Sequence, residues 1–226
     1  MKLFLSRAFI QEPSKNFAQL GDIALSIPGD PTAELPESHP ASAEMDLDAL
    51  FGEALHPERT DSLERLHPPR SLHRLDAETA DMLRQLMEIT ERGFGATRYV
   101  YCELPILWIV DRDGILWFSV EEIIKEDTLE FVRPRLRNVQ VEDRYQRLGH
   151  PALIKGDHGR IGGELLFDVG APEPGWYLTN GSGRYGLREG RIAAHLSNAA
   201  RKFGSYGITL REFFIPVKMR ARENAN

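Results

Sequence analysis

The sequence of 226 residues predicts an α+β fold with a mostly antiparallel sheet and two main helices. Its strand-like runs follow one another and its helical segments stand apart, whereas strict alternation of strand and helix would predict a parallel sheet. The Asp113-Gly114 pair between two β-rich runs, residues 106–110 and 115–120, is a strong hairpin signal. A composition of 42% hydrophobic and 9% aromatic residues is typical of a globular chain with one good core.

The clearest helix is expected at residues 76–92, where Asp76 can cap the first turn and Gly93 ends the apolar pattern. A second helix is expected at residues 190–203, because apolar residues recur there on one helical face. Further strands are predicted at residues 2–10, 164–169, 176–179 and 208–217. The first of these strands would belong to the core although it lies far from the others in the sequence.

An acidic, proline-rich segment separates that first strand from the rest. Residues 28–73 hold ten acidic residues, three arginines and seven of the fourteen prolines, but Phe51 is their only aromatic residue. Such a composition buries too little apolar surface to offset the entropy of ordering. We therefore predict a partly disordered linker or insertion with one short helix at residues 43–55. The organisation is then an N-terminal strand region (1–27), this segment, and a main α+β domain (74–226).

Several classes of site and location are disfavoured by the sequence. The single cysteine, Cys102, allows no intramolecular disulfide and no multi-cysteine zinc site. The four histidines of residues 28–73 are spaced too irregularly to predict a metal site. The N-terminus lacks the apolar region of a signal peptide, and the longest apolar run, residues 104–110, is too short to cross a bilayer. We expect no membrane contact and a protein that is cytoplasmic or exported without a cleaved signal.

Basic residues gather in two places. Residues 184–222 hold nine Lys or Arg against two Glu, and an earlier cluster comprises Arg133, Arg135, Arg137, Arg144 and Arg147. Such a distribution suits an anionic small molecule, an acidic protein partner or nucleic acid, or it is a solvated helix face. Nucleic acid is the less favoured ligand, because the aromatic residues that stack on single strands are sparse here.

A glycine-rich window is the most specific feature of the sequence. Residues 149–186 hold ten glycines, and the loop Asn180-Gly181-Ser182-Gly183-Arg184-Tyr185 collects four different polar side chains. The strand with Glu164 and the strand leading to Asn180 are separated by a short turn, so we expect them to pair and to form one cavity.

The side chains of this cavity have distinct expected roles. The predicted catalytic residues are His150, Ser182, Tyr185 and Glu164, with His150 as a base because its ordinary pKa is near neutral. The predicted ligand-binding residues are Arg184, Asn180 and Gly183, with the Arg184 fork on a phosphate or carboxylate. In the alternative interpretation, Ser-Gly forms a tight turn, Tyr185 packs in the core and His150 caps a turn.

The window resembles the C-terminal module of plant IQ-motif-containing calmodulin-binding proteins, and is similar to modules at the C-termini of some bacterial toxin-like proteins. The resemblance covers about a third of the chain. The matching residues are His150, Pro151, Leu153, Gly162, Gly163, Asn180, Ser182, Gly183 and Tyr185. Arg184 stands where the family has histidine, and the proline expected soon after the tyrosine is absent. The resemblance implies a shared fold, but calmodulin binding does not carry over, because no complete IQ motif is present.

Two classes of function follow. The first is an effector-like or toxin-like domain with a nucleotide-dependent group transferase activity, for which NAD is the candidate cofactor. Arg7, Ser119 and Glu164 occur in the order of the key residues of ADP-ribosyltransferases, but the Glu-x-Glu pair and the Ser-Thr-Ser triplet of that family are missing. No Walker loop, Rossmann fingerprint, His-Glu-x-x-His or Gly-x-Ser-x-Gly motif is present. The second class is a non-catalytic binding module that docks an acidic partner through its basic C-terminal half.

Overall fold

The computed structural model describes residues 46–92, 102–137 and 139–217, which contain two sheets and five helices. The larger sheet has the order β1 (His73–Arg74), β3 (Leu116–Val120), β2 (Ile106–Asp111), β7 (Gly159–Asp168), β8 (Gly175–Thr179) and β9 (Arg211–Phe213). The smaller sheet has the order β5 (Phe131–Pro134), β4 (Glu122–Lys125) and β6 (Tyr145–Leu148). All strand pairs are antiparallel except β8 with β9. The α+β class is therefore confirmed.

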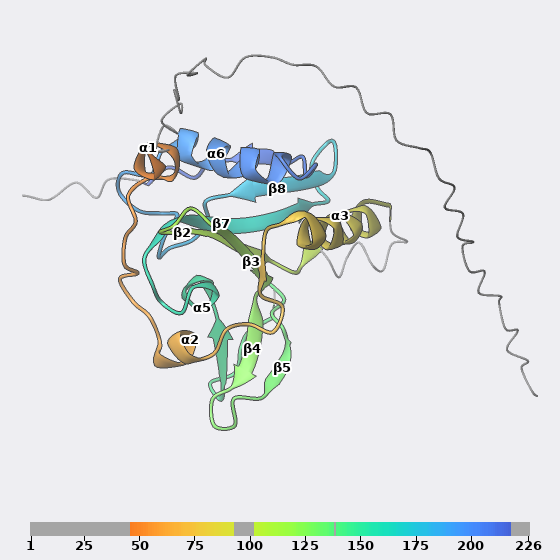
Figure 1. Ribbon diagram of the computed structural model, residues 1–226. Coiled ribbons are helices and arrows are strands. Elements are labelled where there is room, and N and C mark those ends of the chain that lie inside the picture. The colour runs from red at the N-terminus through yellow and green to blue at the C-terminus, as the bar shows by residue number, and fades with distance from the viewer. Residues whose placement is uncertain (1–45, 93–101, 138, 218–226) are drawn as a thin grey trace, which may run out of the picture. The chain divides into compact units, whose positions relative to one another are not determined.

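The helices cover both faces of the larger sheet. Figure 1 shows α3 (Ala77–Arg92) and α6 (Ala193–Gly204) on one face and α5 (His150–Leu153) on the other. The short helices α1 (Leu47–Phe51) and α2 (Ser62–Leu66) contact α6 and α5, respectively. The smaller sheet extends away from the larger one on the side of α5 and α2 (Figure 1).

Strand β2 is buried on both faces and divides the core in two. Trp108 packs with α3 and α6 in the larger cluster, where its ring meets Phe203 edge-on. Its neighbours Leu107 and Ile109 belong to a smaller cluster with Leu153 and Tyr185. Successive side chains of a strand point to opposite faces, so the continuous apolar run of β2 supplies both clusters.

Most predicted elements of the second half of the chain are present, with shifted ends. The hairpin forms between β2 and β3, and Gly114 supplies the positive φ of 78° that its turn requires. The predicted final strand, residues 208–217, is reduced to β9, which runs parallel to β8 because α6 crosses over between them. The smaller sheet was not predicted, and the turn expected at His150-Pro151 is the helix α5. The predicted strand at residues 2–10 and residues 28–45 lie outside the described residues.

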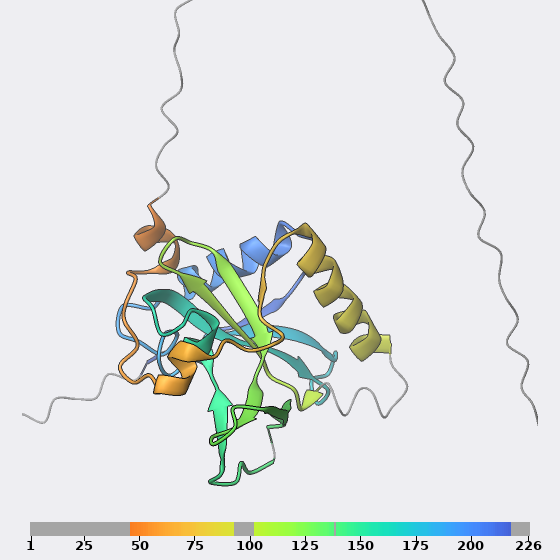
Figure 2. The ribbon, with the colours of Figure 1, turned by 60° about the horizontal axis from the view of Figure 1, so that its bottom comes forward.

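The described part of the acidic segment differs from the expected disordered linker. Residues 46–72, which we call the strap, run from α1 past α5 to β1 (Figure 2). Phe51 is buried, and Leu55 exchanges two backbone hydrogen bonds of 3.0 Å with Gly159. Near the end of the strap, the backbone N–H groups of Arg70 and Ser71 donate to the Glu122 carboxylate. The strap is thus fixed by backbone and side-chain contacts to later parts of the chain, which the average composition of residues 28–73 does not reveal.

Two glycines of the window let three backbone segments approach closely. A Cβ at Gly163 would lie 1.8 Å from the carbonyl oxygen of Thr179, and one at Gly186 would lie 2.1 Å from the carbonyl oxygens of Asn180 and Gly162. Trp108 stands opposite Gly163 on β2, and its indole N–H donates across β7 to the same Thr179 oxygen, 3.2 Å away. A large ring over a glycine fills the space that a missing side chain leaves. These glycines therefore serve packing.

We expect Gly163→Ala to lower the free energy of unfolding by more than about 3 kcal/mol, because the new methyl group meets backbone atoms that cannot rotate away. Gly183→Ala, in the same window, is the matched control: a Cβ there meets no atom within 4 Å, and the change should stay within roughly 0.5 kcal/mol. Chemical denaturation of both variants measures the difference. Equal stabilities would contradict the packing role of Gly163.

Candidate functional site

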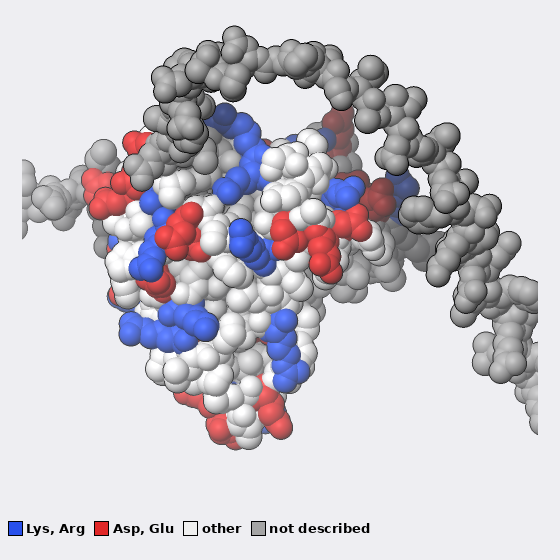
Figure 3. Space-filling model, in the orientation of Figure 1, with Lys and Arg blue, Asp and Glu red and all other residues white. Residues whose placement is uncertain are grey.

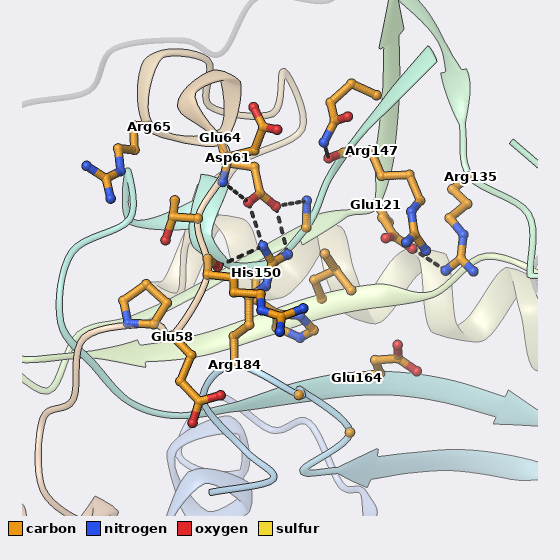
Figure 4. A pocket seen from close by; sticks show the side chains of 18 of the residues that line it. Glu58, Asp61, Glu64, Arg65, Glu121, Arg135, Arg147, His150, Glu164 and Arg184 are labelled. Atoms are coloured by element: carbon orange, nitrogen blue, oxygen red, sulfur yellow. Dashed lines mark hydrogen bonds and ion pairs between the residues drawn. The ribbon is translucent and has the colours of Figure 1, made fainter. Parts of the chain in front are cut away.

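A polar cleft of about 1080 Å³, which we call the main cleft, opens at the surface of the described residues. It lies between the strap, the β4–β6 side of the molecule and the glycine-rich window, as Figure 4 shows. Its lining comprises residues 56–61, Glu64, Arg65, Leu107, Glu121, Arg135, residues 146–147, residues 149–150, Glu164, Gly181, Gly183 and Arg184.

A buried carboxylate, Glu64, forms one wall of the main cleft. It is 2% exposed, and both of its oxygens accept from the guanidinium of Arg184, at 2.5 and 2.7 Å. It also accepts from the backbone N–H groups of Asp61 and Gly149, each at 3.1 Å. The Asp61 contact closes the capping box of α2. A Cβ at position 149 would lie 2.3 Å from the Arg184 guanidinium, so a larger residue there would displace Arg184 from its present position.

Two further ion pairs hold the opposite side of the cleft. Glu121, which is buried, accepts from the Arg135 guanidinium at 2.5 Å. Glu164 accepts from Arg137 at 2.7 Å, and its side chain is 22% exposed. Figure 4 shows the first pair and Glu164 across the cleft from α2. These carboxylates are therefore neutralised by arginines of the cluster that precedes the window.

Three arginines of the cleft have no such partner. Arg59, Arg65 and Arg147 are exposed, and none of them forms an ion pair with another described residue. By contrast, Glu58 pairs weakly with Arg188 at 3.4 Å, and Asp61 caps α2. The carboxylates of the cleft are occupied while three guanidinium forks are available, so the cleft has an unmet capacity for anions.

The window residues predicted to share one cavity divide into two groups. His150, Glu164, Gly183 and Arg184 line the main cleft. The pairing that was expected to bring them together is confirmed, since Glu164 on β7 stands opposite Thr179 on β8. Asn180, Ser182 and Tyr185 do not line the cleft, and each is at most 1% exposed. The prediction that all of these residues line one cavity is therefore wrong for Asn180, Ser182 and Tyr185.

The three buried residues have contacts that account for their positions. The Asn180 amide donates to the Ile215 carbonyl and accepts from the Ile215 N–H, which extends the β8–β9 pairing by one side chain. The Tyr185 hydroxyl donates to the Asp157 carbonyl at 3.0 Å, and burial raises its pKa far above the ordinary range. The Ser182 hydroxyl is buried without a hydrogen-bond partner among the described residues. These contacts agree with the alternative interpretation of the sequence, in which the loop is a tight turn and Tyr185 packs in the core.

His150 is a buried, neutral histidine. Its Nε2 lies 2.9 Å from the Gly163 carbonyl oxygen, and since a carbonyl can only accept, this nitrogen carries the proton. The pKa of His150 is lowered to about 4, chiefly by burial and to a lesser extent by the nearby Arg184 charge, while the hydrogen bond to Gly163 opposes this shift. A base with this pKa is weak at neutral pH.

The contacts of the predicted catalytic side chains favour a binding site over a site for covalent catalysis. No hydrogen bond joins the side chains of any two of His150, Glu164, Ser182 and Tyr185, so the four supply no nucleophile–base pair.

Within residues 46–92, 102–137 and 139–217, no three His, Cys, Asp or Glu side chains are placed to hold a metal ion. No helix in these same ranges is both long and apolar enough to cross a membrane.

The described basic residues of the C-terminal half, up to residue 217, do not form one charged surface. Arg211 pairs with Glu173, Arg191 is buried, and Lys202 lies over the ring of Phe51. Figure 3 shows basic and acidic side chains interspersed over one face of the molecule. The unpaired arginines of the main cleft come instead from the strap and from β6, and the strap arginines were not predicted as site residues. The Asp61-x-x-Glu64 capping pattern is the sequence signal that marks their helix.

The chain matches no protein-family model, no curated protein and no solved structure.

Arg184→Ala should lower the free energy of unfolding by roughly 2–3 kcal/mol, because it leaves the Glu64 carboxylate buried without its counter-charge. The double variant Glu64→Ala/Arg184→Ala should lose less than the sum of the single changes. Arg84→Ala, which breaks an exposed pair on α3, should cost at most about 0.5 kcal/mol. Denaturation curves test this, and an Arg184 variant as stable as the Arg84 variant would contradict the structural role.

Stability should also depend on pH through His150. Its pKa is about 4 in the folded protein and 6.5 ordinarily, so the unfolded chain binds the proton first as the pH falls. The folded state should thus lose roughly 3 kcal/mol between pH 6.5 and 4, and the loss should level off below pH 4. His150→Gln keeps a donor for Gly163 but does not titrate. The stability difference between the two proteins should shrink across this range, and parallel curves would refute the assignment.

Proposed function

We propose that the protein is a non-catalytic binding module that docks an acidic segment of a partner protein in the main cleft. The observation that carries the proposal is the imbalance of the cleft: its carboxylates are paired or cap a helix, while Arg59, Arg65 and Arg147 have no acidic partner among the described residues. Guanidinium forks bind carboxylates through two parallel hydrogen bonds.

The surrounding ion pairs support this role. Glu64–Arg184 joins the strap to the glycine-rich window, Glu121–Arg135 joins neighbouring segments on the opposite side of the cleft, and both carboxylates are buried. Such pairs hold the walls in place before a ligand arrives, which reduces the ordering cost of binding. The available arginines stand on these fixed walls and are themselves exposed to solvent. Binding is therefore expected to be electrostatic and to weaken as salt is added.

Group transfer is less well supported. It needs a reacting side chain in the cleft, and Ser182 and Tyr185 are buried outside it. The phosphates of NAD would use the same arginines, so competition of NAD with an acidic peptide would reveal nucleotide binding. The effector-like or toxin-like role stays a prediction that rests on the resemblance of the window.

The test uses a fluorescent peptide, Ser-Glu-Ser-Glu-Ser, and the full chain at low salt. Arg147→Ala should weaken its binding by about tenfold, as loss of a charge-assisted contact does. Arg147→Lys should retain part of the affinity, since it keeps the charge without the fork.

The matched control is Arg74→Ala, which removes an exposed arginine that lines no part of the main cleft. It should leave the affinity unchanged. Equal losses in the Arg147 and Arg74 variants would indicate attraction by net charge and would contradict a site in the cleft.

A further inference from the structure

The end of α1 is fixed to the rest of the domain by donors from other segments, and α1 lies against α6 (Figure 1). Three side chains donate to carbonyl groups at this end, namely Asn198 to Leu50 at 2.8 Å, Arg160 to Gly52 at 2.9 Å and Arg191 to Glu53 at 2.8 Å. The last carbonyl groups of a helix have no partner within it, so these bonds complete the helix. Phe51 of the same turn is buried in the larger core cluster. The docking of α1 therefore depends on a few polar contacts as well as on one aromatic ring.

His195 lies directly beside these contacts. Both His195 and Arg191 are 6% exposed. A Cβ at Gly52 would lie 3.1 Å from the His195 ring and 2.5 Å from the Arg191 guanidinium, so both side chains face the glycine that ends α1. A charge that forms on His195 therefore lies next to the Arg191 charge and to the end of α1.

The neutral form of His195 fits this position, and the protonated form does not. Its Nδ1 lies 3.4 Å from the Ile192 nitrogen, and because that N–H group can only donate, Nδ1 accepts and carries no proton. Protonation removes this acceptor from the first turn of α6. It also places a positive charge at a helix N-terminus, where the backbone dipoles disfavour one. Burial, and to a lesser extent the Arg191 charge, lower the pKa of His195.

The other charged groups around Arg191 do not compensate for a charge on His195. They are Arg160, Arg188, Asp48 and Glu53. Asp48 is already paired with Arg160, and Glu53 is exposed. None of the described carboxylates forms an ion pair with His195. A proton on His195 therefore meets more positive than negative charge, and the strain falls on the contact with α1.

We infer that His195 is a proton-sensitive latch: neutral His195 keeps α1 docked, and protonation releases α1 from α6. The strap is next held at Leu55, so the released segment is residues 46–54. Its release uncovers the Phe51 ring and the apolar side chains of α6 beneath it. The latch thus exposes an apolar surface in response to acidic pH. The inference goes beyond the proposed function, because it concerns the strap alone and needs no ligand.

The experiment follows hydrogen–deuterium exchange of the full chain at about pH 7.5 and about pH 5, on either side of the ordinary pKa of histidine. Protection is the ratio of the intrinsic to the observed exchange rate, which corrects for the effect of pH on exchange itself. The buried strand β2 is the reference for global unfolding. On acidification, the protection of residues 47–54 should fall by at least about threefold more than that of β2.

His195→Gln should remove this difference, because glutamine at the third position of a helix can still accept from the Ile192 N–H but does not titrate. His158→Gln is the matched control. His158 also touches the strap, through an edge-on ring contact with His56 at 5.2 Å, and its loss should leave the pH dependence of α1 unchanged. If the His195 variant does not fold, the comparison of α1 with β2 in the wild-type protein still tests the release.

Every other outcome overturns the latch. Equal losses of protection in α1 and β2 would show global unfolding, and no loss in α1 would show that it stays docked. The same pH dependence in the wild-type and His195→Gln proteins would assign the release to another group. Its disappearance in His158→Gln would assign it to the contact with His56. None of these outcomes decides whether the main cleft binds an acidic peptide.

Discussion

The geometry of the cleft depends on one carboxylate, that of Glu64. Its oxygens receive two guanidinium contacts from Arg184 and two backbone N–H groups, from Asp61 and Gly149. These partners belong to the strap, to the glycine-rich window and to the start of α5. A buried charge is tolerated only when its hydrogen-bonding capacity is filled. The three segments must therefore meet at this point, and the cleft is the space that they leave beside it.

The contact with Glu64 also changes the role that we assign to Arg184, from ligand binding to holding the cleft wall. A guanidinium at the tip of a glycine-bounded loop suggests a ligand-binding residue, but the fork of Arg184 is already occupied by a carboxylate of its own chain. The proposed anion binding then falls to Arg59, Arg65 and Arg147, which have no acidic partner among the described residues. The cleft combines ion pairs, which hold its walls, with unpaired guanidinium groups, and the proposed preference for an acidic segment rests on that arrangement.

The glycines of the window are explained by close packing of the backbone, and the window also lies beside the main cleft. Gly163 and Gly186 allow strands and loop to approach within backbone contact, and Trp108 fills the space over Gly163. This crowding buries Ser182 and Tyr185. The window therefore contributes Glu164, His150 and Gly183 to the lining of the main cleft, but its sequence pattern did not distinguish the residues that face the cleft from those that pack behind it.

The sequence by itself determined the α+β class, the Asp-Gly hairpin, the helical character of residues 77–92 and 193–204, and the pairing of the strands with Glu164 and Thr179, because periodicity, turns and caps are local signals. It did not predict that the described residues hold five helices, where two main ones were expected. Only the tertiary structure decided that the strap folds onto the domain and that Glu64 meets Arg184, 120 residues away. It also decided which arginines stay unpaired. The physical reason is that charge pairing depends on distance in space, and for two charges far apart in the sequence their separation along the chain does not predict that distance.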